Sequence, residues 1–275
     1  MSPSETTATA EGVTESWTSG DHYERFMGRW SRLVAEEFLA WLAIDARARW
    51  LDAGCGTGAL SETILARATP RRVTGIDPAE AFVAFARHRL PDARIQFRIG
   101  DLQSLPVENG GFDIAVAGLV LNFVPEPARA LSEMRRAVRP DGTVAVYVWD
   151  YAGEMQLLRH FWDAAAALDA AARELDEGRR FPICKPEPLL AAFDEAGFVD
   201  VEIRPIDIPT TFRDFDDYWS PFLGGQGPAP TYCASLPDAQ REALRGLLCA
   251  ELSAASDGSI RLKARAFAVR GIRRG

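Results

Sequence analysis

Short apolar runs alternate with longer amphipathic segments between residues 50 and 149, and this alternation limits the possible folds more than any other feature. The apolar runs predict strands at 50–53, 72–76, 94–99, 112–117 and 142–149. Between them, apolar residues recur every three or four positions and predict helices at 60–67, 79–89 and 127–138. Strands and helices that alternate at this spacing favour right-handed βαβ units. The sequence therefore predicts an α/β fold built on a mainly parallel sheet.

The segments that flank this alternation are predicted to extend it. Residues 23–42 carry apolar side chains at helical spacing, which indicates an N-terminal helical arm. Residues 1–15 are rich in Ser, Thr, Ala and Glu, and we expect them to be a disordered tail before a single domain at 16–275. The pattern ends with a predicted helix at 186–196 and predicted strands at 199–212 and 264–272.

Two segments, 151–185 and 213–259, interrupt the alternation, and we interpret them as helical cap insertions. In the first, apolar residues at helical spacing predict one long helix at 157–175. A hairpin between the last two strands would need only about 2–5 residues, so the second segment is too long for a turn. The insertions contain the aromatic residues Phe161, Trp162, Tyr218, Trp219, Phe222 and Tyr232. These could line an apolar pocket, although packing within a helical core explains Phe161 and Trp162 equally well.

The charge balance argues against a nucleic-acid partner, because the formal net charge of −8 repels polyphosphate. Basic residues between 261 and 274 alternate partly with apolar ones, which favours the solvated face of a last strand over a nucleic-acid patch. We therefore expect a small molecule rather than DNA or RNA as the partner.

The cysteine spacing and the apolar runs indicate the compartment. Cys55, Cys184, Cys233 and Cys249 form no C-x-x-C pair, so neither a zinc site nor a disulfide framework is expected. The N-terminus lacks the basic and apolar regions of a signal peptide, and the longest apolar run, 114–124, is too short to span a membrane. The sequence predicts a soluble, cytoplasmic protein with no membrane partner and no bound metal.

A glycine-rich turn, Asp-Ala-Gly-Cys-Gly-Thr-Gly at 52–58, follows the first predicted strand. Gly54, Gly56 and Gly58 let backbone N–H groups approach a ligand closely. The spacing departs from the dinucleotide motif G-x-G-x-x-G, whose third glycine is absent here. The carboxylate of Asp52 would repel a pyrophosphate but suits the α-ammonium group of a methionine moiety. A tight turn with Asp52 as a local cap is the structural alternative.

Two further acids end the next two predicted strands. Asp77 follows the glycines by roughly 20 residues, where a carboxylate can accept both hydroxyls of a ribose. Asp101 can accept an adenine amino group while the N–H of Leu102 bonds a ring nitrogen, although Asp101 alone would more often be a turn cap. The carboxyl ends of parallel strands share one edge of the sheet, so Asp52, Asp77 and Asp101 should line one crevice.

These motifs resemble those of class I S-adenosylmethionine (SAM)-dependent methyltransferases. The subgroup that they resemble is the small-molecule type related to the ubiquinone/menaquinone-biosynthesis methyltransferases. The resemblance rests on residues 51–58, 75–78, 100–102, 112–114 and 139–143. It covers roughly residues 50–150, with a looser likeness at 23–31.

The resemblance implies a Rossmann-like sheet of seven strands whose last strand is antiparallel, in a methyltransferase domain over residues 16–275. It implies SAM as the cofactor. The residues implied are Asp52, Gly54, Gly56, Gly58 and the backbone of Ala117 at the methionine part, Asp77 at the ribose, and Asp101 with Leu102 at the adenine. Ala53, Cys55 and Pro78 belong to the same motifs. Tyr23 and Arg29 match by position only, with helix packing and a surface charge as their alternatives.

The chemistry of a sulfonium donor leaves the protein mainly an aligning role. The methyl group needs no electrophilic activation, so we expect direct in-line displacement by a small-molecule acceptor. The aromatic residues of the insertions would suit an acceptor that is hydrophobic or aromatic. His22, His88 and His160 are better explained as partly exposed helical residues than as general bases, and no catalytic residue is assigned. Two alternatives stay open: an NAD-dependent oxidoreductase, and a SAM-binding protein without methyl transfer.

Overall fold

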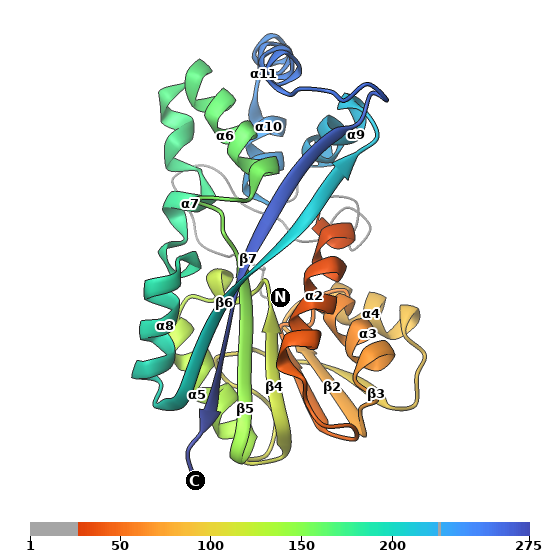
Figure 1. The fold of residues 1–275 in the computed structure, drawn as a ribbon, viewed down its shortest axis with the longest axis vertical. Helices are drawn as coiled ribbons and strands as arrows, with labels where there is room; N and C mark the ends of the chain where they lie inside the picture. The colour runs from red at the N-terminus through yellow and green to blue at the C-terminus, as the bar shows by residue number, and fades with distance from the viewer. Residues whose placement is uncertain (1–26, 225–226) are drawn as a thin grey trace, which may run out of the picture. The chain divides into compact units, whose positions relative to one another are not determined.

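The computed structural model describes residues 27–224 and 227–275 of the chain. The strands in these residues are β1 Arg49–Ala53, β2 Arg72–Asp77, β3 Ile95–Ile99, β4 Phe112–Gly118, β5 Val138–Trp149, β6 Phe198–Phe212 and β7 Ile260–Arg273. They form a seven-stranded sheet in the order β3-β2-β1-β4-β5-β7-β6 (Figure 1). Strands β1 to β5 pair in parallel, and β7 is antiparallel to β5. The predicted α/β fold with an antiparallel last strand is confirmed.

Helices connect and cover these strands. The α-helices in the described residues are α2 Arg29–Leu42, α3 Ala59–Arg67, α4 Glu80–Arg89, α5 Pro127–Ala137, α6 Gln156–Leu168, α7 Glu177–Arg180, α8 Pro186–Glu195, α9 Phe215–Trp219, α10 Pro228–Ser235 and α11 Asp238–Glu251. Short 3-10 helices lie at η2 Leu121–Phe123, η3 Ala170–Glu174, η4 Pro182–Cys184 and η5 Ser220–Gly224.

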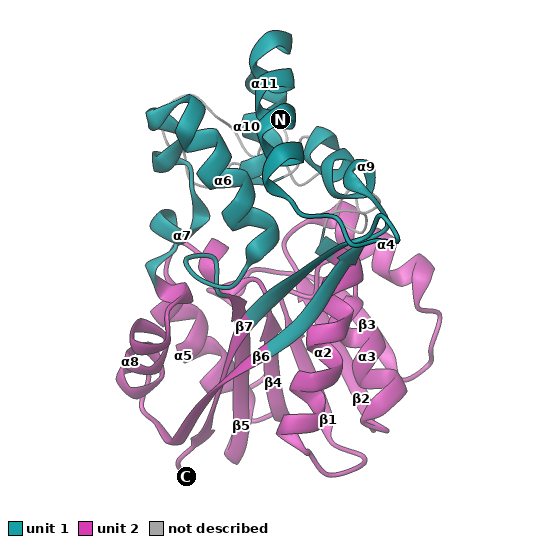
Figure 2. Cartoon of the chain, turned by 45° about the horizontal axis from the view of Figure 1, so that its top comes forward, with its two compact units in different colours: residues 1–27, 150–182, 207–265 teal, residues 28–149, 183–206, 266–275 magenta. Residues whose placement is uncertain are grey.

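The chain divides into two compact units (Figure 2). Unit 2 comprises Gly28–Trp149, Ile183–Ile206 and Ala266–Gly275, and the described residues of unit 1 are Met27 and those within Asp150–Pro182 and Asp207–Arg265. Most of both predicted insertions falls in unit 1. Their role as a cap, and the expectation of a single domain over residues 16–275, stay predictions.

Unit 2 holds the parallel strands in an apolar core. Helices α2, α3 and α4 group together on one side of these strands, and α5 groups with α8 on the other (Figures 1 and 2). Parallel strands covered on both faces are apolar along most of their length, and Val144, Ala145 and Val146 of β5 have no exposed surface. Phe38 of α2 packs on Tyr147 of β5, with ring centroids 4.7 Å apart. This two-sided burial explains why the apolar runs predicted these strands.

Unit 1 has an aromatic core of its own. Phe161 of α6 stacks on Phe222 at a centroid distance of 4.4 Å, and Trp162 lies 5.6 Å from Tyr232. The hydroxyl of Tyr218 donates a hydrogen bond to the carbonyl of Leu157, at 3.0 Å. The aromatic residues of the insertions therefore pack against one another, as the alternative of a helical core had predicted.

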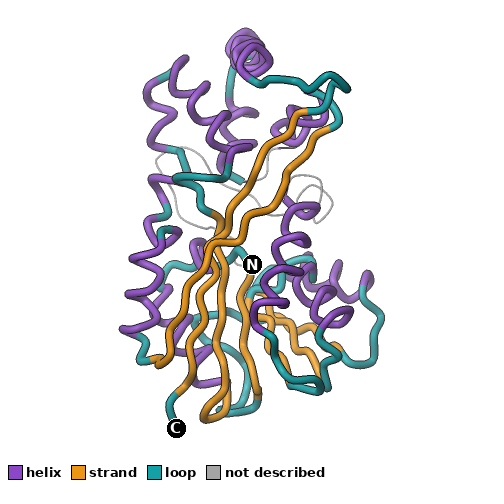
Figure 3. The backbone as a smooth tube through the Cα atoms, viewed as in Figure 1, coloured by secondary structure: helices purple, strands orange, loops and turns teal. Residues whose placement is uncertain are grey.

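The last two strands are the longest, and they run side by side (Figure 3). Two of the C-terminal basic residues pair with acids of β6: Arg265 with Asp207 at 2.6 Å, and Arg270 with Glu202 at 2.8 Å. These ion pairs agree with the interpretation of the C-terminal basic segment as the solvated face of a last strand.

One predicted element is too long. The periodic pattern at 157–175 predicted a single helix, but α6 ends at Leu168. The side chain of Asp169 accepts a hydrogen bond from the N–H of Ala171, which starts the separate 3-10 helix η3. Asp competes with the helical backbone in this way, and apolar periodicity does not register it.

Candidate functional site

The glycine turn follows β1 and needs glycine for conformational and steric reasons. Gly54, Gly56 and Gly58 have φ angles of +78°, +51° and +86°, in the left-handed region that side chains disfavour. A Cβ on Gly54 would lie 2.7 Å from both Cγ atoms of Val120. The N–H groups of Gly54 and Cys55 donate to the carbonyl of Ile76, at 2.7 and 3.0 Å, and tie the turn to β2.

Asp52 is fully buried beneath this turn. Its Oδ2 accepts a hydrogen bond of 2.6 Å from the hydroxyl of Ser61 on α3, whereas its Oδ1 has no partner among the described residues. Burial raises the pKa of Asp52 to about 7, the Ser61 bond lowers it, and the charge of Asp77 raises it further. A desolvated carboxylate with a free oxygen is costly unless a cation or donor binds there. Asp52 therefore has the properties expected of a ligand-binding acid.

Asp77, at the end of β2, joins the same turn. Its Oδ2 accepts the N–H of Gly56 and its Oδ1 the N–H of Ala79, both at 2.9 Å. Burial raises the pKa of this carboxyl group. A carboxylate offers about four acceptor sites, so two remain for a ligand. The structure thus brings Asp77 and the glycine turn together, with the adjacent Pro78 exposed.

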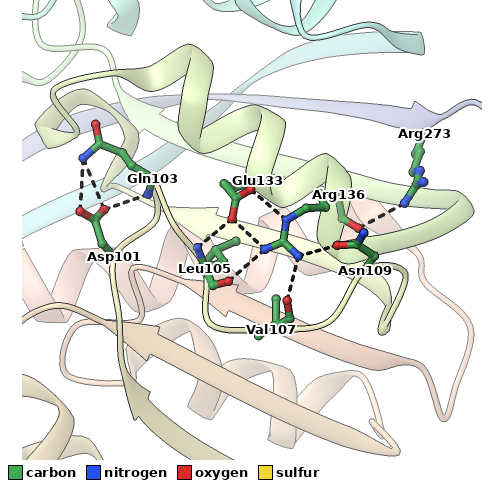
Figure 4. Close-up of polar contacts among 8 residues, drawn as sticks. All are labelled: Asp101, Gln103, Leu105, Val107, Asn109, Glu133, Arg136 and Arg273. Carbon is green, nitrogen blue, oxygen red and sulfur yellow. Dashed lines mark hydrogen bonds and ion pairs between the residues drawn. The ribbon is translucent and has the colours of Figure 1, made fainter.

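Asp101 lies beyond the end of β3, beside β2. Asp77 is in register with Ile99, and the N–H of Gly100 donates to the carbonyl of Asp77 at 3.1 Å. The exposed carboxylate of Asp101 accepts the N–H of Gln103 at 2.8 Å and contacts its side-chain amide (Figure 4). Asp101 therefore does cap a turn, as the alternative had it, while its position at the strand edge fits the predicted crevice. The side chain of the neighbouring Leu102 is buried.

The loop after Asp101 is anchored by a pair that the sequence patterns did not reveal (Figure 4). Arg136 of α5 donates to the carbonyl groups of Leu105 and Val107, at 2.9 and 2.8 Å, and pairs with Glu133 at 2.7 Å. Glu133 in turn accepts the N–H of Leu105 at 2.9 Å. Charge-assisted bonds to several backbone groups hold a loop more firmly than side-chain packing alone.

The other predicted site residues have mixed positions. Ala117 is buried in β4, one residue beyond Val116, which is in register with Asp52. Arg29 is the first residue of α2, and its guanidinium lies 4.4 Å above the ring of Trp30. Tyr23 lies outside the described residues.

His160, one of the three histidines weighed above as general bases, has a structural partner, and so does Asp150. His160 Nδ1 lies 2.8 Å from an oxygen of Glu251, and Asp150 accepts the N–H groups of Gly153 and Glu154 at 3.0 Å. Burial raises the pKa of Cys233 to about 11, which keeps its thiol protonated. His22 lies outside the described residues, and no general base emerges from the others.

Residues 27–224 and 227–275 contain no group of three or more His, Cys, Asp or Glu side chains placed to hold a metal ion. Within the same ranges, every helix is too short or too polar to cross a membrane.

The family of the domain follows from comparison with known proteins. Residues 51–146 match the model of a methyltransferase domain, so this part of the chain is a methyltransferase domain. The chain is 32% identical over 128 residues to trans-aconitate 2-methyltransferase of Variovorax paradoxus, covering 46% of this chain and 48% of that protein. It is 33% identical over 123 residues to malonyl-[acyl-carrier protein] O-methyltransferase of Pectobacterium atrosepticum, covering 45% and 47%. The chain thus matches about half the length of these curated relatives.

A solved structure shares the fold. Phosphoethanolamine N-methyltransferase 2 of Haemonchus contortus, in complex with S-adenosyl-L-methionine, superposes with a TM-score of 0.58 at 16% identity, covering 93% of this chain and 56% of that one. The prediction of a class I SAM-dependent methyltransferase domain is confirmed. The likeness to the ubiquinone group is only approximate, because the relatives act on several classes of molecule.

Proposed function

We propose that this protein transfers the methyl group of SAM to a small-molecule acceptor. One observation carries the proposal: Asp52 is a fully buried carboxyl group with an unpartnered oxygen, and it lies beneath a glycine turn that is hydrogen-bonded to Asp77. A ligand with a cationic amino group would pair with the carboxylate of Asp52, and a ligand with a diol would donate hydrogen bonds to Asp77. SAM carries both groups.

The residues present fit SAM on steric grounds as well. A Cβ on Gly56 would meet no atom within 4 Å, so the outer side of the turn is open to a ligand. We assign the α-ammonium of SAM to Asp52, its ribose hydroxyls to Asp77, and its adenine to Asp101 and the N–H of Leu102. Ala117 would border the methionine part through its backbone. Tyr23 and Arg29 remain proposed contacts.

The bound sulfonium supplies an activated methyl group. The chain's own residues then have to bind and orient the two reactants, which suits the absence of an assigned general base. Alignment of the acceptor for in-line displacement is part of the proposal, as is a cytoplasmic location. The latter is supported by Cys55, Cys233 and Cys249, which form no disulfide bond in the described residues.

The relatives suggest which acceptors to include in a first panel. Their names specify trans-aconitate and a malonyl group on an acyl-carrier protein, both of which are carboxylates. A carboxylic acid, a phenol or another small nucleophile therefore belongs in the first panel to be tried.

Incubation with methyl-labelled SAM and a panel of carboxylic acids, phenols and amines tests the proposal. Labelled product is expected with the wild-type protein and not with Asp52→Asn. SAM binding without transfer to any acceptor would instead favour a SAM-binding protein with no methyltransferase activity.

A further inference from the structure

Asn122 is a buried polar side chain whose amide forms no hydrogen bond within the part of the chain that the structure describes. It has 7% of its surface exposed, and neither its Oδ1 nor its Nδ2 has a hydrogen-bond partner in the described residues. Burying a polar group without a partner destabilises the folded protein, and an amide presents a donor and an acceptor together. A leucine of similar size would avoid this cost. The amide at this position therefore indicates a partner other than the described residues, and a bound ligand meets that requirement.

The position of Asn122 connects it to the SAM site. It belongs to η2, which follows β4 at the edge of the sheet where Asp52 and Asp77 lie. Val120, two residues earlier, is so close to Gly54 that a Cβ there would overlap its methyl groups. The segment that carries Asn122 thus lies directly against the glycine turn, which we assign to the methionine end of SAM. The methyl group to be transferred belongs to that end.

We propose that Asn122 binds an uncharged hydrogen-bonding group of the methyl acceptor, a hydroxyl or a carboxamide, and so helps to determine its specificity. This inference rests on the proposed function. Asn122 is neutral, and the acids at the same edge of the sheet, Asp52 and Asp77, are both desolvated. An anion there would be desolvated and would gain no charge-charge attraction from the amide. A neutral group that both donates and accepts hydrogen bonds can pair with the Oδ1 and the Nδ2 of Asn122.

Fragment binding tests the proposal without knowledge of the natural acceptor. The wild-type complex with S-adenosylhomocysteine is titrated with phenol, benzamide and benzoate, and binding is followed by ligand-observed NMR. Benzamide and benzoate have the same shape and differ in charge. We expect phenol or benzamide to bind at least tenfold more tightly than benzoate.

Two variants identify the residue responsible. Asn122→Leu should weaken binding of the neutral fragment at least tenfold while leaving the affinity for S-adenosylhomocysteine within about twofold and the melting temperature unchanged or higher. Thr210→Val is the matched control, because Thr210 is fully buried on β6 and its hydroxyl also has no partner. That variant should leave fragment binding unchanged.

Three results would overturn the proposal. Equal fragment affinities in the wild-type protein and Asn122→Leu would mean that the amide is only a packing or water-binding group. Loss of S-adenosylhomocysteine binding in Asn122→Leu would assign the amide to the cofactor. No binding of either neutral fragment to a wild-type complex that holds S-adenosylhomocysteine would reject the acceptor site, whereas failure of the wild-type protein to bind S-adenosylhomocysteine at all would reject the proposed function itself.

Discussion

Replacing Asp52 with asparagine separates the charge of this side chain from its shape. Asparagine keeps the size and can still accept the hydroxyl hydrogen of Ser61, but it carries no charge. The pKa of Asp52 is raised to about 7, first by burial, so its ionisation changes in a range where the protein can be studied. If Asp52 holds the α-ammonium group of the cofactor, only its ionised form binds tightly. Affinity for S-adenosylhomocysteine should therefore rise with pH in the wild-type protein.

The size of this effect follows from the pKa. With a pKa of about 7, about one-eleventh of the molecules carry an ionised Asp52 at pH 6, and about ten-elevenths do at pH 8. The dissociation constant should fall roughly tenfold over this interval, which corresponds to about 1.4 kcal/mol. Asp52→Asn loses a hydrogen bond between charged groups, about 1.5–3 kcal/mol at pH 8, and should show no such slope.

Calorimetric titrations with S-adenosylhomocysteine at pH 6, 7 and 8 measure both effects. Titration of the ligand itself is common to all proteins and cancels in the comparison. Asp92→Asn is the control, because this variant makes the same chemical change at an exposed site, where the Asp92 carboxylate pairs with Arg94 at 2.7 Å. Parallel pH slopes in the wild-type protein and Asp52→Asn, or equal affinities at pH 8, would refute the assignment.

Three further predictions concern binding and stability. Asp77→Ala should weaken binding of S-adenosylhomocysteine by about 1.5–3 kcal/mol, as measured by calorimetry, and unchanged affinity would contradict the ribose assignment. In chemical denaturation, Gly54→Ala should lower the free energy of unfolding by roughly 2–4 kcal/mol, because the φ of Gly54 is +78° and a Cβ would overlap Val120. Gly56→Ala, with open space around the Cβ, should lower it by roughly 1–2 kcal/mol. Equal losses in the two variants would argue against the overlap. Burial raises the pKa of Glu177 to about 7, so its contribution to stability is present at low pH and is lost as the pH rises from about 4.5 through 7. Glu177→Gln should reduce the loss of unfolding free energy between pH 5 and 8 by on the order of 2–3 kcal/mol, and an unaltered slope in pH-dependent denaturation would contradict this.

The sequence predicted the parts of the fold whose burial leaves a periodic pattern. Strand β4 contains an apolar run, Ile114 to Ala117, that is fully buried, and its bounds differ from the prediction by one residue. The end of α6 was missed because Asp169 terminates it through a local hydrogen bond within an otherwise apolar pattern. Periodicity thus indicates which face is buried, but not where a capping side chain stops a helix.

The site was predictable where one strand edge determines it. Asp52 and Asp77 lie at the ends of neighbouring parallel strands, so topology brings them to one edge of the sheet, and the turn that follows Asp52 is hydrogen-bonded to Asp77 through Gly56. Ser61 was missed because a single buried serine on a helix resembles an ordinary packing residue. Asn122 and Arg136 were missed because their roles depend on segments that are distant in the sequence.

The central claim, that the turn at residues 52–58 binds a SAM-type cofactor, is tested most directly by calorimetry of the intact protein with S-adenosylhomocysteine and with NAD. The account predicts saturable binding of S-adenosylhomocysteine, weakened in Asp52→Asn and Asp77→Ala, and no binding of NAD. Binding of NAD without binding of S-adenosylhomocysteine would contradict it.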